Sequence, residues 1–485
     1  MSARQILWVA VVLFSALAVA QTATLSKEVQ QFVSVTAPKI VLTHVRVIDG
    51  TGAPAVDDQN VVIENGKITA IEKGGDVGES QGTRVLDLRG HTVMPGIVGM
   101  HNHLYYVARP NLDSQRHYDQ PVLVPEMAFS SPRLYLAGGV TTMRTTGCVE
   151  PYTDLNLKQD IDAGKLPGPH IDVTAPYLEG PGSHFIQMMR LTGPDDARQN
   201  VDFWANRGAT SFKAYMNITR AELKAAIDEA HKRGLKLTGH LCSVTYKEAA
   251  ELGIDDLEHG FFVNTELDPG KKPDVCSEDQ GNATLAQMEP NSAEAKDLIQ
   301  TLIQYHVAVT STLPVFEEYG KGLSPVRQQM LDAMMPQARE DYFLARQPRT
   351  KPPKIDPALL WKHELGLEYE FAKAGGLLLS GPDPTGAGDV VPGFGDQRGI
   401  ELLAEAGFTP VEAIRIATLN GAIFLGRDQQ IGSIAAGKDA DLVVIKGDPS
   451  QKIGDVENVE IVFKDGVGYD SQKLLESVRG RYGQY

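Results

Sequence analysis

The middle of the chain alternates short apolar segments with helix-forming segments, and this alternation limits the fold more than any other feature. The clearest helix-forming stretch, 219–234, opens with Thr219 and Glu222 and closes with Gly234. Strands that alternate with helices predict a parallel sheet of the α/β class. Eight segments have strand character: 96–104, 139–147, 170–179, 211–216, 236–241, 255–262, 307–314 and 376–383.

Eight such units in succession predict a (β/α)₈ TIM barrel with insertions. A doubly wound open sheet is the structural alternative. It lacks support because no Gly-x-Gly-x-x-Gly turn follows the first apolar segment. Two segments, 263–295 and 315–358, break the rhythm and are rich in Pro, Lys, Asp and Glu. We expect long loops there, which either shape a substrate pocket or extend into solvent.

Both ends of the chain carry a different pattern, in which Val and Ile recur between Asn-Gly and Gly turns. This pattern predicts short antiparallel strands. We expect a small β-sandwich domain built from both chain ends, residues 21–94 and 424–485, beside the barrel of residues 95–423. The strand-rich blocks are 40–50, 60–74, 83–96, 433–449 and 458–470.

The first twenty residues have the features of a signal peptide. Arg4 gives a positive start, residues 6–18 are apolar, and Ala18-Val19-Ala20 offers a cleavage site before Gln21. The apolar run is short for a membrane span, so we expect cleavage and no stable membrane insertion. The sequence therefore predicts an exported protein, periplasmic or secreted.

Charge and cysteine content exclude two further classes. The chain has 46 Lys and Arg against 62 Asp and Glu, a net charge of -16, and no basic run, which excludes nucleic acid as a partner. The three cysteines, Cys148, Cys242 and Cys276, form no Cys-x-x-Cys pair, which rules out a thiolate metal site. One disulfide can form in an oxidising compartment, and the sequence does not select the pair.

Two histidines stand two residues apart where the first barrel strand ends. His101 and His103 therefore point to the same side of the strand. Two neutral imidazoles on one side of a strand end can share a metal ion. A His-x-His pair is weak evidence when taken alone, because buried histidines often only accept or donate hydrogen bonds.

Four further polar residues, a lysine, two histidines and an aspartate, stand at the ends of other predicted strands. Burying them without partners would cost several kcal/mol each, and the strand ends of this barrel gather at one face, where catalytic residues collect. Lys213 needs its own explanation, because a dication repels an ammonium group. Either CO₂ carbamylates the amine to give a bridging carboxylate, or the lysine pairs with an acid. The set is Lys213, His240, His259 and Asp383, whereas His44, His91, His231, His306 and His363 have ordinary surface or structural positions.

Several longer motifs accompany these residues: VMPGIVGMHNHL, GVTTMRTTG, GPHIDVTAPYLEGPGSH, FKAYM, GIDDLEHG and the terminal TPVEAIRIATLNGAIFLGR and IGSIAAGKDADLVVI. Together they resemble the amidohydrolase superfamily, in particular its imidazolonepropionase-like and prolidase-like dipeptidase branch. This resemblance implies two divalent metal ions, for which zinc is expected. One ion would be held by His101, His103 and Asp383, the second by His240 and His259, and a carboxylated Lys213 would bridge them.

The chain departs from the pattern of this branch at two places. Thr145 follows Arg144 where relatives commonly carry Asp, and Pro382 and Pro384 flank Asp383. Neither change touches a ligand, but both bear on substrate specificity.

The resemblance implies a hydrolase that cleaves a carbon–nitrogen bond by attack of a metal-bridged hydroxide. Asp383 would act as the catalytic acid and base, and His184 and Tyr105 would contact a dipeptide or N-acyl amino acid substrate. A cyclic-amide hydrolase is an alternative. A mononuclear deaminase is another, although that class generally lacks the lysine. A non-catalytic binding protein would be expected to have lost ligands. The sequence leaves open whether the protein forms a homo-oligomer.

Overall fold

We describe a computed structural model of the chain, covering residues 25–108, 122–124, 126–183, 185–347, 353–385 and 390–483. The predicted signal peptide and His184 lie outside the described residues. Within these ranges, no helix is both long enough and apolar enough to span a bilayer.

The strands expected in the middle of the chain are all present and run parallel. They form one sheet of three strands, in the order β11-β10-β7, and one of five, in the order β12-β13-β14-β15-β16. This confirms the α/β class. The strands are β7 (Ile97–Asn102), β10 (Val140–Thr145), β11 (His170–Asp172), β12 (Ser211–Ala214), β13 (Lys236–Gly239), β14 (Asp256–Glu258), β15 (Ala308–Ser311) and β16 (Leu378–Ser380).

The two parallel sheets meet at both of their edges. Isolated parallel bridges join Thr174 to Ser211 and Leu178 to Ala214, which connects the segment after β11 to β12. At the other edge, the backbone N–H of Asp383 donates to the carbonyl of His101 at 3.0 Å. The order of the strands is that of the predicted barrel, and its complete closure stays a prediction.

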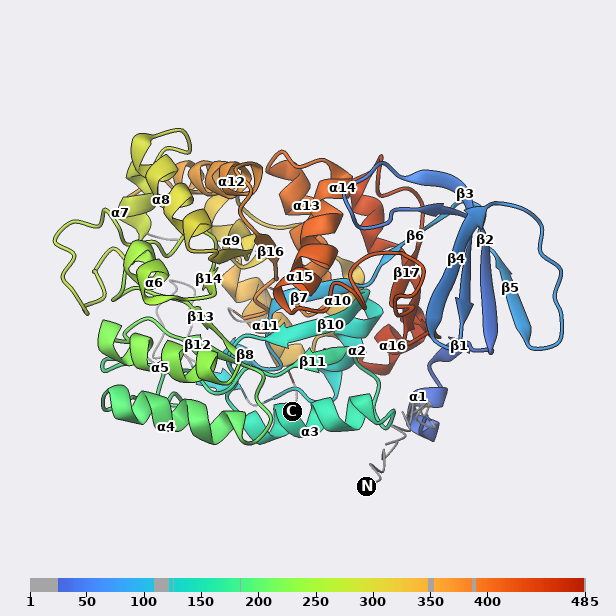
Figure 1. Cartoon of the computed structure of the whole chain (residues 1–485), viewed down its shortest axis with the longest axis horizontal. Helices are drawn as coiled ribbons and strands as arrows, with labels where there is room; N and C mark the ends of the chain where they lie inside the picture. Colours follow the sequence, from blue (N-terminus) through green and yellow to red (C-terminus); the bar gives the residue numbers. More distant parts are fainter. Residues whose placement is uncertain are drawn as a thin grey trace, which may run out of the picture.

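Helices surround these strands and bury their apolar faces against them (Figure 1). Helix α5 has the predicted start, since Thr219 and Glu222 form a reciprocal capping box at its N-terminus. Helices around the sheets include α2 (Ser130–Ala137), α3 (Pro151–Asp162), α4 (Pro194–Ala205), α5 (Arg220–Lys232), α6 (Tyr246–Leu252), α8 (Ala293–Gln304), α12 (Pro357–Lys373) and α13 (Phe394–Glu405).

Strands from both chain ends share one nine-stranded sheet, at one end of the molecule in Figure 1. Strands β6 and β17 join the two ends by antiparallel pairing. Its order is β1-β19-β18-β17-β6-β2-β3-β4, with β5 on β2. Its strands are β1 (Val33–Val35), β2 (Lys39–Val47), β3 (Val56–Glu64), β4 (Lys67–Lys73), β5 (Thr83–Asp87), β6 (His91–Pro95), β17 (Leu442–Lys446), β18 (Val459–Lys464) and β19 (Val467–Asp470).

The expectation of purely antiparallel strands is wrong for two of these. Both β5 and β6 pair with β2 in parallel. Strand alternation reports which face is buried, not the direction of the neighbouring strand, so the sequence pattern could not distinguish the two pairings. The arrangement of the sheet as a sandwich stays a prediction.

The second irregular segment is largely helical rather than a long loop. It contains α9 (Leu313–Gly320), α10 (Gln328–Ala333) and α11 (Pro336–Ala345). Pro336 and Pro357 lie in the first turns of α11 and α12, where proline is favoured and its missing N–H costs nothing. Two of the prolines that suggest a loop in the sequence therefore begin helices. The first irregular segment is a loop up to α7 (Asn282–Gln287).

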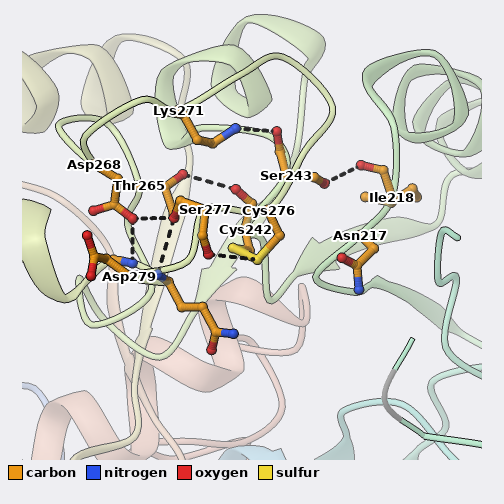
Figure 2. Close-up of a disulfide and its surroundings, with 12 residues drawn as sticks. Asn217, Ile218, Cys242, Ser243, Thr265, Asp268, Lys271, Cys276, Ser277 and Asp279 are labelled. Carbon is orange, nitrogen blue, oxygen red and sulfur yellow. Dashed lines mark hydrogen bonds between the residues drawn. A yellow bond between two sulfur atoms is a disulfide. The ribbon is translucent and has the colours of Figure 1, made fainter. Parts of the chain in front are cut away.

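A disulfide joins Cys242 to Cys276, and Cys148 is free and buried. Cys242 lies just past β13, whereas Cys276 belongs to the loop after β14, so the bond attaches this loop to the neighbouring strand end (Figure 2). Two hydrogen bonds reinforce the attachment: Thr265 Oγ1 donates to the Cys242 carbonyl at 3.1 Å, and Lys271 Nζ to the Ser243 carbonyl at 2.6 Å.

Candidate metal centre

The predicted ligands converge where the parallel strands end. His101 lies in β7 and His103 just after it, and Lys213 lies in β12. The other three follow strand ends. His240 comes directly after β13 and His259 directly after β14, and Asp383 comes shortly after β16. His240 is partly exposed, and the other five are buried. Positions spread over the sequence thus meet at one place.

His101, His103 and Asp383 form one part of the site, which we call the β7 half. Asp383 Oδ1 lies 3.2 Å from His103 Nε2 and 3.6 Å from His101 Nε2. Lys213 Nζ lies 3.3 Å from His101 Nε2. Three nitrogen donors and a carboxylate oxygen therefore surround one small space.

His240 and His259 form the other part, which we call the β13/β14 half. Their ring centroids are 4.4 Å apart, and the ring of His259 lies 4.5 Å from that of His101. Ligand atoms of His101, His259 and Asp383 all lie within 4.8 Å of one another. Imidazole nitrogens with carboxylate oxygens are the donor set that zinc favours. The residues present therefore fit a divalent metal centre.

Two of the predicted ligands have backbone conformations that non-glycine residues rarely adopt. His259 has φ of 71° and Asp383 has φ of 52°. Such left-handed residues cost free energy and cluster at functional sites. The strand end before Asp383 lies so close to β7 that a Cβ on Gly381 would come within 2.2 Å of the backbone nitrogen of His101. Glycine is needed there for the two strands to meet.

The electrostatics of the site keep imidazoles neutral and the carboxylate ionised. Burial is the main cause that holds the pKa of His101 and of His259 well below the usual range. Burial acts to raise the pKa of Asp383, but the interactions of its carboxylate with His101, His103 and Lys213 outweigh it and hold that pKa well below its usual range. Burial lowers the pKa of Lys213 to about 8. Neutral imidazoles and an anionic carboxylate are the forms that bind metal.

Aromatic side chains border the ligands. The ring of Tyr105 lies 4.7 Å from His103, and its hydroxyl is hydrogen-bonded to that of Tyr177. Tyr215 lies 4.8 Å from His240, and Phe316 packs edge-on against His259. Tyr105, a predicted substrate contact, is therefore beside the site, whereas His184, the other, lies outside the described residues.

A buried ionic network beneath the ligands was not predicted. Arg144 donates to both Asp256 and Glu258, and Glu258 accepts a hydrogen bond from His101. Adjacent strand residues point to opposite sides, so a functional His259 gives no reason to expect Glu258 in the same site. The available signal is the spacing: Asp256 and Glu258 are two apart on a buried strand, and two buried acids need a cation.

A family model confirms the predicted relationship. The Amidohydrolase family model matches residues 92–468, and the chain belongs to this family.

Curated relatives and solved structures agree with this membership. The chain is 30% identical over 128 residues to a dihydroorotase of Elusimicrobium minutum, covering 25% of this chain and 26% of that protein. It is 34% identical over 113 residues to an imidazolonepropionase of Parabacteroides distasonis, covering 21% and 27%. A Xaa-Pro dipeptidase structure with bound methionine superposes with a TM-score of 0.64 at 21% identity, covering 89% of this chain and 100% of that one.

The family match places the chain in the amidohydrolase superfamily. The sequence matches span only about a quarter of the curated relatives' length. The match to the dipeptidase structure shows a shared fold of the TIM-barrel type.

Proposed function

We propose that this protein is a metal-dependent hydrolase that cleaves an amide-like carbon–nitrogen bond at the mouth of a closed (β/α)₈ barrel. The observation that carries the proposal is the convergence of six predicted ligands from five strands. Membership of the amidohydrolase family and the hydrolase names among its relatives support it.

We propose that the site holds two divalent ions, with zinc the expected metal. His101, His103 and Asp383 would hold one ion and His240 and His259 the other. Bound there, the ions would supply an acidified water and polarise the substrate carbonyl. Asp383 is kept anionic by its neighbours. It would take a proton from the attacking water and pass it to the leaving nitrogen.

Lys213 would bridge the two halves as a carbamate. Its amine nitrogen forms a bond to the carbon of CO₂ and releases one proton, which leaves an anionic carboxylate on the side chain. Support comes from its position, because its Nζ lies buried 3.3 Å from His101 Nε2. An ammonium group enclosed by imidazoles and dications has no favourable charge state, whereas a carbamate supplies an anion. This position also disfavours a mononuclear deaminase.

A dipeptide or N-acyl amino acid with an apolar side chain is the substrate class we propose. Aromatic rings border both halves of the site, with Tyr105 and Tyr177 beside His103 and Phe316 beside His259. Such rings favour burial of an apolar group next to the scissile bond. The structural neighbours include a Xaa-Pro dipeptidase, which is consistent with this class.

A substrate panel tests the proposal. Full-length protein loaded with zinc should hydrolyse dipeptides or N-acyl amino acids with apolar side chains faster than charged ones. Hydrolysis of cyclic amides alone would instead support the cyclic-amide alternative, which the similarity to a dihydroorotase keeps open. Release of ammonia from an amine-bearing ring without amide cleavage would favour a deaminase.

We further propose that the protein is exported. The Cys242–Cys276 disulfide supports this, because disulfides persist in oxidising compartments and are rare in the cytosol. Intact mass of protein from the native host should show a mature chain beginning at or near Gln21. A chain that retains Met1 would contradict the proposal.

A further inference from the structure

A fully buried arginine connects strands on opposite sides of the barrel interior, directly below the candidate metal centre. Arg144 extends from β10, and its Nε and Nη2 donate to the carbonyl of Met100 at 3.0 and 2.7 Å. The same Nη2 reaches Glu258 Oε1 at 2.8 Å and Asp256 Oδ2 at 3.2 Å on β14. Met100 precedes His101, so the guanidinium contacts the backbone of one ligand strand and the carboxylates of another.

The two oxygens of Glu258 have separate partners. Oε1 accepts hydrogen bonds from Thr238 Oγ1 at 2.6 Å and from Arg144 at 2.8 Å. Oε2 lies 2.7 Å from His101 Nδ1. A carboxylate can only accept, so Nδ1 of His101 carries the hydrogen and Nε2 keeps its lone pair. That Nε2 is the atom nearest to Lys213 and Asp383.

We propose that Glu258 is a positioning residue for the metal centre, which fixes the tautomer and orientation of His101, with Arg144 and Thr238 holding Glu258 in place. The inference rests on the proposed metal-dependent function. Carboxylate partners of this kind set the ring orientation of metal-binding histidines and raise their basicity. Glu258 therefore acts on metal binding through His101 and need not touch the substrate.

Asp256 provides a matched control in the same network. It lies two residues before Glu258 on the same strand, is equally buried, and also contacts Arg144. It also accepts a hydrogen bond from Thr310 Oγ1 at 2.8 Å, on the neighbouring strand. A purely structural role of the network would make the two acids equivalent, whereas a positioning role distinguishes Glu258.

The test compares Glu258→Gln with Asp256→Asn in the full chain. Zinc affinity is measured by competition with a chromophoric chelator, and the cobalt(II)-loaded proteins are compared by visible absorption. We expect Glu258→Gln to weaken zinc binding by about 10–100-fold and to change the cobalt spectrum, while Asp256→Asn keeps both close to wild type. Equal zinc affinities of the two variants would overturn the inference.

A second variant covers the case in which Glu258→Gln does not fold. Glu258→Asp keeps the charge that pairs with Arg144 but is too short to reach His101 as well, so zinc affinity should still fall. Wild-type affinity in Glu258→Asp would overturn the inference. Failure of the wild-type protein to bind any divalent metal would instead contradict the proposed function itself.

Discussion

His101 and His240 show how differently the two halves of the candidate metal centre are held. His101 lies within a strand, is completely buried, and is hydrogen-bonded to Glu258. His240 follows the end of β13, is partly exposed, and lies two residues from a disulfide-bonded cysteine. His101 is thus held by a buried polar network, whereas His240 lies beside a loop that a disulfide attaches to the strand end. A substitution at His101 therefore also disturbs a buried carboxylate, whereas a substitution at His240 lies next to a cross-linked loop.

The largest effect is expected where the two halves meet. Lys213→Ala should remove the anionic bridge, lower metal occupancy and cost several orders of magnitude in hydrolysis rate. Acetate or propionate should restore part of the activity by filling the vacated space. Lys213→Arg should not retain the metal occupancy or the hydrolysis rate, because a guanidinium group stays charged and cannot react with CO₂. Near-normal rate and metal content in Lys213→Arg would show that the lysine is only a structural partner.

Removing one ligand from each half separates their structural roles. Both His101→Ala and His240→Ala should lose metal and activity. His101→Ala should also lower the melting temperature of the metal-free protein, because it leaves the buried Glu258 carboxylate without its imidazole partner. His240→Ala should leave that temperature nearly unchanged. Circular dichroism melts in excess chelator measure this, and equal melting temperatures would contradict the asymmetry between the halves.

Much of the fold and the ligand set follows from the sequence, because both depend on local patterns. Strand periodicity located all eight parallel strands, and the strand-end position of residues such as His240 and Asp383 predicted their convergence. Pairing direction did not follow, as β5 and β6 show, because the same alternation suits either direction.

Interactions across the interior were equally inaccessible from the sequence. The contact between Arg144 and Glu258 joins residues 114 positions apart, and no local pattern identifies such a partner. The disulfide partner of Cys242 was likewise open, since three cysteines allow three pairings.

The disulfide should matter mainly to the β13/β14 half. Cys276→Ser removes a cross-link across 34 residues, which the chain-entropy model values at roughly 3–4 kcal/mol. We expect a melting temperature lower by several degrees and weaker binding of one metal ion, while the other stays bound. Calorimetry and stepwise metal titration measure both effects. Cys148→Ser, which keeps the disulfide, is the control; an identical titration of the two variants would remove the link between disulfide and metal site.

The smallest effect concerns a buried acid pair behind the same half. Glu364 accepts a hydrogen bond from the N–H of Phe261 at 2.9 Å, two residues after His259. Burial raises the pKa of its neighbour Glu368 from 4.5 to about 7. The folded state therefore holds this proton more tightly, so stability falls as pH rises from about 4.5 to 7 and the loss is complete above that range.

Glu368→Gln removes this ionisation. The variant should gain a few degrees in melting temperature relative to wild type at pH 8 and less at pH 5. Glu370→Gln, on the same helix and only half-buried, is the control. A pH-independent difference between Glu368→Gln and wild type would contradict the raised pKa.

Metal content together with activity tests the central claim most directly. Purified full-length protein, analysed by inductively coupled plasma mass spectrometry, should carry close to two divalent ions per chain. Dialysis against a chelator should remove the ions and the hydrolytic activity together, and added zinc should restore both. A metal-free preparation that hydrolyses its substrate at the full rate would contradict the account.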